Sequence, residues 1–305
     1  MGLTESQKKL IQQIANNNIT EIRKSALQCL QEDTTQKNAL FCERYKKILQ
    51  SSQGMNMLEL PMDLRSFVHL EDASGFQEGR YFLTEAENKV CQSILKMSQV
   101  SQRLSEMQIP YVNSTLLYGE SGTGKTMFGK YVAYRMGLPF CYLNFSHLIS
   151  SYMGETSKNI SKVFSYVISN PCVFMLDEID CISIRRGESD SSSGSKEMSR
   201  ITISLMQEMD RIPNNIIVLA ATNRKDRMDE ALLRRFTIHH EVKSLPKEDR
   251  EALVKKYLAD VQFSFSDDEI QKLINKCSNP SVLINEIVQM IAEKIAEKEC
   301  KKNEY

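Results

Sequence analysis

The chain has 305 residues, of which 41% are hydrophobic, which is enough for a buried core and for about two domains. Its 39 Lys and Arg residues balance its 39 Asp and Glu residues, and a net charge of zero argues against a general nucleic-acid binder. The 8 cysteines form no Cys-x-x-Cys pair, which argues against zinc or redox motifs and favours reduced thiols in a cytoplasmic protein. No apolar stretch approaches the roughly 20 residues of a membrane-spanning helix, so we expect no membrane contact.

The N-terminal part of the sequence predicts a small helical module over residues 1–52. Its apolar residues recur three and four positions apart, and short polar breaks divide the pattern into two or three helices. This module could bind a substrate or an adaptor, or it could be a dimerising helical tip. The stretch SSQGMNMLELP contains polar residues and ends in proline, so we expect a linker over residues 53–68. Another helical pattern follows over about 80–108.

The middle of the chain alternates short apolar runs with longer amphipathic ones. This alternation predicts an α/β domain with a parallel sheet, which we place at residues 69–245. Beyond Pro246 only helical patterns remain, so a small all-helical domain is expected over 246–305. The expected strands are 115–118, 140–145, 172–176, 215–221 and 238–242, and the helices between and after them are 125–136, 155–169, 196–209, 228–234, 247–259, 266–276 and 280–298.

The stretch GESGTGKT follows the first of these strands and opens a helix. Its glycines let several backbone N–H groups point inward, which makes a cradle for phosphate at the helix N-terminus. Lys125 adds a positive charge for the β- and γ-phosphates, and the Thr126 hydroxyl suits Mg²⁺. The context of strand, loop and helix favours a P-loop for ATP over a plain glycine-rich turn. The predicted nucleotide-binding residues are Gly119, Glu120, Ser121, Gly122, Thr123, Gly124, Lys125, Thr126 and, beside the adenine, Met127.

Two later strands end in polar side chains that hydrolysis would need. The run CVFMLDEID delivers Asp177 and Glu178 to the carboxyl edge of the sheet, where ligands bind in such folds. We expect Asp177 to serve the Mg²⁺ shell and Glu178 to orient and deprotonate an attacking water. Asn223 ends the strand in LAATN, where it could contact the γ-phosphate or that water; the alternative is an ordinary turn residue.

The stretch DEALLRRF places Arg234 and Arg235 at the end of a short helix. A solvated basic helix end is one reading, because positive charge suits the helix dipole there. The other reading is that both face the nucleotide of a neighbouring subunit as arginine fingers, which stabilise charge in the phosphoryl-transfer transition state.

In that order and spacing, GESGTGKT, VFMLDEID, LAATN and DEALLRRF resemble the core of an AAA+ ATPase. The last two resemble the second region of homology of the AAA clade, which includes katanin, spastin and the proteasomal ATPases. The resemblance covers about residues 70–300. It implies a five-stranded nucleotide domain, a helical lid and a homo-oligomeric ring, usually a hexamer. It also implies that Arg234 and Arg235 act on the neighbouring subunit's ATP.

The stretch LISSYMGETSKNISKVF is similar to the first pore loop of the AAA clade. In that loop an aromatic-aliphatic pair followed by glycine grips a polypeptide in the ring channel. Tyr152, Met153 and Gly154 match this pattern, whereas Ser151 stands where the family often has lysine. An ordinary surface tyrosine is the alternative reading.

Two departures from the family bear on nucleotide contacts. No arginine follows Arg250, so the lid lacks the sensor arginine of many AAA+ groups, as the AAA clade does; the glycine usual in that turn is also missing from SNPSVLINEI. The stretch HLEDASGFQEGRYFL only loosely resembles the adenine-side turn, where Asp72, Gly75 or Tyr81 could lie near the base. Met127 is the better candidate for packing on adenine, although a core methionine is an equal alternative.

The leading hypothesis is therefore an ATP-driven ring that remodels, unfolds or disassembles a protein substrate through a central pore. A DNA-associated helper ATPase is the second; its support is limited to short basic clusters such as IRR at 184–186 and KKYL at 255–258. A scaffold that uses ATP only to assemble is the third, and the complete hydrolysis set argues against it.

Overall fold

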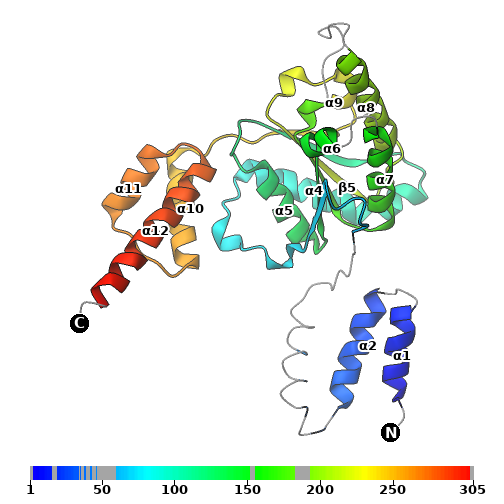
Figure 1. Cartoon of the computed structure of the whole chain (residues 1–305), viewed down its shortest axis with the longest axis horizontal. Helices are drawn as coiled ribbons and strands as arrows, with labels where there is room; N and C mark the ends of the chain where they lie inside the picture. Colours follow the sequence, from blue (N-terminus) through cyan, green and yellow to red (C-terminus); the bar gives the residue numbers. More distant parts are fainter. Residues whose placement is uncertain are drawn as a thin grey trace.

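The structure is a computed structural model that describes residues 3–15, 19–33, 35, 38, 42, 46, 60–151, 155–182 and 193–302. At the N-terminus, α1 (Glu5–Ala15) and α2 (Ile19–Glu32) lie side by side as a helical hairpin (Figure 1). Ser6 of α1 is buried and donates a hydrogen bond to Glu32 at the far end of α2. The predicted helical module thus contains two described helices. None of the described helices is long and apolar enough to cross a membrane.

A six-stranded sheet forms the centre of the middle domain, in the order β1-β3-β4-β5-β2-β6. Its five parallel strands are the five that the sequence predicts, and β1 adds an antiparallel edge strand beside β3. The expected count of five is thus corrected to six. The bounds are β1 (Val68–Glu71), β2 (Asn113–Tyr118), β3 (Phe140–Asn144), β4 (Val173–Asp177), β5 (Ile217–Thr222) and β6 (Ile238–Glu241).

Helices cover both faces of the sheet, as Figure 1 shows for α5 on one side of β5 and α7 on the other. One face packs on α4 and α5, with Ile94 and Phe128 in its core, and the other on α6, α7 and α8, with Phe164 and Leu205 in its core. The helix α6 is short and was not expected from the sequence. The bounds are α4 (Glu85–Glu106), α5 (Lys125–Met136), α6 (Phe145–Ser151), α7 (Thr156–Ser169), α8 (Ser193–Met209) and α9 (Glu230–Leu233), with 3₁₀ turns η2 (Ala73–Gly75), η3 (Glu78–Arg80), η4 (Ile179–Cys181) and η5 (Lys225–Arg227).

The segment before β1 needs a correction at its C-terminal end. Leu64 and Phe67 are almost fully buried in the core under α7 and α8, and Leu60 joins them. Residues 60–68 therefore pack as part of the α/β domain and are not a linker, because their apolar side chains cover one end of the sheet. The remainder of the predicted linker lies outside the described residues.

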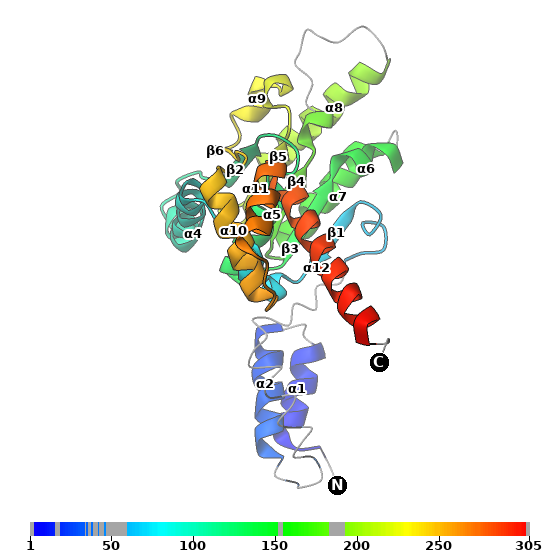
Figure 2. The same cartoon turned by 90° about the vertical axis from the view of Figure 1, so that its left-hand side faces the viewer.

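Three helices form the C-terminal lid: α10 (Lys247–Asp260), α11 (Asp267–Lys276) and α12 (Pro280–Lys302). They share a small core of their own, and Phe82 of the α/β domain packs against it. Figures 1 and 2 show them as a group beside the α/β domain, which matches the predicted helical domain. Arg80 pairs with Asp260 at 2.7 Å and Lys256 donates to the Tyr81 carbonyl at 2.9 Å, so the lid is docked on the segment after β1.

Candidate nucleotide site

The loop between β2 and α5 has the backbone of a phosphate cradle. Gly119, Gly122 and Gly124 all have positive φ angles, of 148°, 77° and 106°. A Cβ at Gly119 would lie 2.3 Å from the Val242 carbonyl oxygen, so no side chain fits there. Glycines permit these angles at little cost, and α5 begins directly after them. The loop therefore presents N–H groups at a helix N-terminus, the arrangement that binds phosphate.

Lys125 is held across this loop. Its ammonium donates to the carbonyls of Gly119 at 2.9 Å and Glu120 at 2.7 Å, and to Asn223 Oδ1 at 2.7 Å. The residue is 7% exposed, and burial lowers the pKa of its ammonium, while Asp177 and Asp180 act in the opposite direction. The Lys125 ammonium thus links the residues that follow β2 and β5. Its positive charge lies where the phosphates of a bound nucleotide would be.

Thr126 and Asp177 meet at the end of β4. The Thr126 hydroxyl donates to Asp177 Oδ2 at 3.0 Å, and Asp177 Oδ1 accepts the Glu178 backbone N–H at 2.8 Å. The lone pairs of that hydroxyl remain free for a cation. The described residues contain no group of three or more His, Cys, Asp or Glu side chains that could hold a metal alone. The donor set fits Mg²⁺, which takes one or two protein ligands and completes its shell with phosphate oxygens and water.

Glu178 has a left-handed backbone, with φ 55° and ψ 38°, and its side chain is exposed. This conformation is uncommon for a residue with a Cβ, and such residues cluster at functional sites. It also turns the chain sharply between β4 and η4. Next to it, Asp180 accepts a hydrogen bond from the Thr222 hydroxyl at 2.8 Å, which links the ends of β4 and β5. Asp180 was not predicted as a site residue, although it stands in the same acidic run.

A cavity lies between the P-loop, the segment after β1 and the lid. Met127 lines it, as does Tyr81, whereas Asp72 and Gly75 do not. Asp72 instead caps η2 by accepting the Ser74 N–H at 2.9 Å. The Tyr81 hydroxyl is buried among core groups, and burial raises its pKa. The other lining residues are Arg80, Phe82, Glu87, Gly122, Thr123, Gly124, Leu245, Leu253, Pro280, Ser281 and Ile284.

The first turn of α12 contacts the P-loop directly. Asn279 Nδ2 donates to the Ser121 carbonyl at 2.7 Å, and the Ser281 hydroxyl donates to the Gly122 carbonyl at 2.9 Å. A Cβ at Gly122 would lie 2.7 Å from the Asn279 amide, so the glycine also makes room for the lid. These contacts join residues about 160 positions apart, and apart from the missing glycine in this turn they could not be predicted from the sequence.

Comparisons with known proteins agree with this geometry. A family model described as "ATPase family associated with various cellular activities (AAA)" matches residues 115–244. The chain therefore contains an AAA domain, the ATPase domain of the AAA+ family. Its AAA domain begins in β2 and ends beyond β6, so the match includes the P-loop, both carboxylates, Asn223 and the arginine pair.

Several curated AAA+ relatives share this part of the chain. A proteasome-activating nucleotidase of Methanopyrus kandleri is 31% identical over 231 residues, which is 74% of this chain and 51% of the relative. The 26S proteasome subunit RPT4 of Saccharomyces cerevisiae is 35% identical over 158 residues, 50% of this chain and 35% of its own length. The ATP-dependent zinc metalloprotease FtsH 3 of a Synechocystis species is 30% identical over 190 residues, 60% of this chain and 29% of its own. The chain thus spans about half or less of these relatives.

Other predicted residues of the AAA domain lie apart from the P-loop. Arg234 is 80% exposed on its side chain and lies 3.7 Å from Glu230. Arg235 makes a two-pronged pair with Asp210, with both N–O distances at 2.9 Å, and donates to the Ala231 carbonyl at 2.7 Å. Among the described residues, neither arginine bonds to a P-loop residue. The predicted pore-loop residues Tyr152, Met153 and Gly154 lie outside the described residues, between α6 and α7.

Proposed function

We propose that this AAA+ chain hydrolyses ATP at the carboxyl ends of β2, β4 and β5. The observation that carries the proposal is the convergence of Lys125 on Asn223 and of Thr126 on Asp177. These four side chains come from three separate stretches of sequence and meet beside a loop whose backbone is shaped for phosphate. A glycine-rich turn without a ligand would need none of these contacts.

Each residue of the site has a separate role in the proposed transfer of the phosphoryl group to water. Loop N–H groups and Lys125 bind and orient the phosphates, and Lys125 exchanges its carbonyl partners for phosphate oxygens when a nucleotide is bound. Glu178 accepts a proton from the attacking water, whose oxygen forms the new bond to the γ-phosphorus while the bond to ADP breaks. Asn223 holds the γ-phosphate or that water. Mg²⁺, held by Thr126 with Asp177 behind it, would supply charge neutralisation on the β- and γ-phosphates.

We further propose that Arg234 and Arg235 complete the site of a neighbouring copy in a homo-oligomeric ring, with six subunits as the expected number. The Arg234 side chain is 80% exposed, and among the described residues its ion pair is a long one to Glu230 at 3.7 Å, so it can reach a second chain. Arg235 is fixed by Asp210 and the Ala231 carbonyl, which orients the end of α9. Neighbouring arginines of this kind stabilise charge on the transferred phosphoryl group.

The proposed substrate is a polypeptide gripped by Tyr152, Met153 and Gly154 in the ring channel, with residues 1–52 as the module that selects it. The names of the relatives support a protein substrate, because they refer to proteasome activation, a proteasome subunit and a metalloprotease. The DNA-helper alternative loses support at 255–258, since Lys255 pairs with Glu251 at 2.7 Å and Lys256 is bonded to the Tyr81 carbonyl.

The test is the steady-state rate of phosphate release across protein concentrations, with an unfolded polypeptide in one series and DNA in another. A specific rate that rises with concentration, and rises again with polypeptide, agrees with sites completed between subunits and a channel for proteins. A rate independent of concentration, or one stimulated only by DNA in a salt-dependent way, contradicts the ring and the protein substrate. Binding of ATP without any phosphate release would favour the scaffold.

A further inference from the structure

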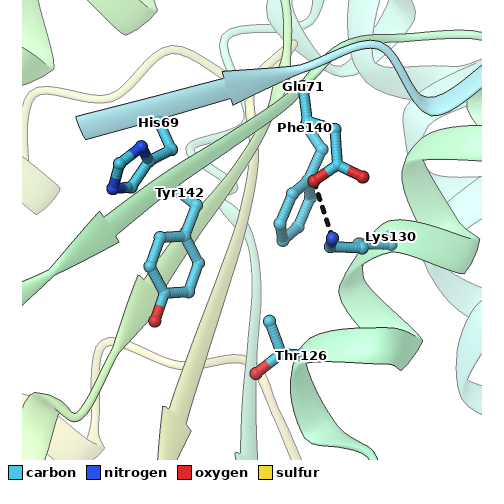
Figure 3. A pocket seen from close by; sticks show the side chains of 6 residues that line it. All are labelled: His69, Glu71, Thr126, Lys130, Phe140 and Tyr142. Carbon is cyan, nitrogen blue, oxygen red and sulfur yellow. Dashed lines mark ion pairs between the residues drawn. The ribbon is translucent and has the colours of Figure 1, made fainter. Parts of the chain in front are cut away.

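A second pocket opens beside Thr126 (Figure 3). It lies between α5, the edge strand β1 and its neighbour β3. In Figure 3 the hydroxyl ends of Tyr142 and Thr126 lie toward one end of the pocket, and the ion pair of Glu71 with Lys130, at 2.6 Å, lies toward the other. His69 and Phe140 complete its lining.

Strand register explains why Tyr142 lies near the carboxylate site. In the parallel pair of β3 with β4, Asn144 is opposite Asp177 and Tyr142 is opposite Met175. Side chains two residues apart on a strand share a face, so Tyr142, Asn144 and Asp177 all belong to the face that α5 covers. Thr126 is on the first turn of α5 and Lys130 one turn later, so both face β1 and β3.

The Tyr142 hydroxyl has a defined hydrogen-bonding arrangement. Asn144 Nδ2 donates to the Tyr142 oxygen at 3.3 Å, which leaves the tyrosine's own proton free to be donated. Asn144 is fixed in turn, because its Oδ1 accepts the His147 N–H at 3.1 Å at the start of α6. Burial raises the pKa of Tyr142 to about 12, and the nearby carboxylates of Asp177 and Glu178 act in the same direction, whereas the hydrogen bond from Asn144 opposes them.

We propose that Tyr142 is a positioning residue for the Mg²⁺ site, whose hydroxyl, oriented by Asn144, donates to Asp177 and holds the carboxylate against the Thr126 hydroxyl. This inference rests on the proposed nucleotide site. The Asp177 carboxylate then has three donors: Thr126, the Glu178 N–H and Tyr142. Partners behind a metal ligand commonly change metal affinity by about 10- to 100-fold when they are removed.

The test is a Mg²⁺ titration of ATP binding in a Glu178→Gln background, which is expected to block hydrolysis, with a fluorescent ATP analogue as the probe. Tyr142→Phe keeps the ring and removes the hydroxyl. It should raise the half-saturating Mg²⁺ concentration on the order of tenfold, while the affinity for the analogue in EDTA and the melting temperature in EDTA stay unchanged.

Two further variants separate positioning from packing. Tyr166→Phe removes another tyrosine hydroxyl, on α7 at the opposite face of the sheet, and should leave the Mg²⁺ titration unchanged. Asn144→Ser keeps an acceptor for the start of α6 but removes the donor to Tyr142, so it should raise the half-saturating Mg²⁺ concentration by a smaller factor. It also tests the inference if Tyr142→Phe does not fold.

An unchanged Mg²⁺ requirement in both Tyr142→Phe and Asn144→Ser would overturn the inference. Equal losses of affinity with Mg²⁺ and in EDTA would also overturn it, because they would assign Tyr142 to the shape of the pocket. Failure of the Glu178→Gln parent itself to bind the analogue at any Mg²⁺ concentration would instead contradict the proposed function.

Discussion

The phosphate side and the arginine side of this AAA domain are built in different ways. On the phosphate side, Lys125, Asn223, Thr126 and Asp177 hold one another within a single chain. On the arginine side, Arg234 is exposed and Arg235 is bound to Asp210, away from the P-loop. One half of the proposed site is therefore pre-organised by folding, whereas the other half, in the proposed ring, acts only where a second chain brings a nucleotide to it.

The largest expected effect is a loss of phosphate release, and it distinguishes Arg234 from Arg235. Arg234→Ala should lower phosphate release by about 10³-fold or more, with an unchanged melting temperature, because the side chain is exposed. Arg235→Ala should lower phosphate release and also cost about 1 kcal/mol of unfolding free energy, since it removes the pair with Asp210. Phosphate release and urea unfolding measure both effects. Phosphate release at the parent's rate from Arg234→Ala would remove that residue from the proposed site.

The next largest effect is expected on stability and nucleotide binding when the P-loop backbone is changed at Gly119. Gly119→Ala should destabilise the fold by about 1–3 kcal/mol and abolish nucleotide binding, because its methyl group would meet the Val242 carbonyl and φ is 148°. Gly75→Ala is the matched control, since nothing lies within 4 Å of its added carbon. Urea unfolding of the two variants should differ accordingly. Equal stabilities would show that the loop backbone is less constrained than its contacts indicate.

A smaller effect is expected where the lid touches the phosphate side. Asn279→Ala removes one hydrogen bond to the Ser121 carbonyl and should weaken ATP binding by about 3- to 10-fold, without changing the stability of the α/β domain. Isothermal titration would measure the affinity.

A double-variant cycle with Gly122→Ala sharpens the test, because the added methyl group would meet the Asn279 amide at 2.7 Å. In that background Asn279→Ala should cost less, or even recover affinity. Strict additivity of the two changes would argue against a direct contact between the lid and the loop.

The smallest expected effect is a pH-dependent change in stability that arises from Glu269 of the lid. Lys294 and the Ser266 cap lower the pKa of Glu269 to about 2. A carboxyl whose pKa is lower in the folded state stabilises the fold above its unfolded value of 4.5, and this contribution is lost as pH falls from about 4.5 toward 2. Glu269→Gln should therefore reduce stability at pH 7 and have no effect near pH 2, as followed by thermal unfolding of the full chain. A loss of equal size at both pH values would contradict this cause.

Features whose pattern lies within a single stretch of sequence could be predicted, whereas features that depend on distant residues could not. The P-loop, the five parallel strands and the lid helices each carry their pattern within one stretch, and the structure has them close to the expected bounds. The strand β1 was missed because Val68–Glu71 is only four residues long and is defined by its pairing with β3, far along the chain. Leu64 and Phe67 resembled linker residues because the core that buries them comes from α7 and α8.

Within the candidate site, the sequence predicted the P-loop residues and the polar strand ends but not the contacts that hold them. Asn223 could have been a turn residue, and its bond to Lys125 depends on β5 lying beside β2. The contact of Asn279 with the P-loop and the position of Tyr142 in the pocket beside Thr126 likewise follow from tertiary packing. Met127 does line the cavity beside the lid, whereas Asp72 caps a turn.

The proposal that Glu178 accepts the proton of the attacking water is tested by comparing Glu178→Gln with the parent chain. ATP binding and phosphate release of both would be measured at a protein concentration where the parent is active. The account predicts unchanged ATP affinity and a loss of phosphate release of about 10²- to 10⁴-fold, because only the acceptor of the water's proton is removed. Phosphate release by Glu178→Gln at the parent's rate would contradict the assignment of this residue and of the reacting site at the end of β4.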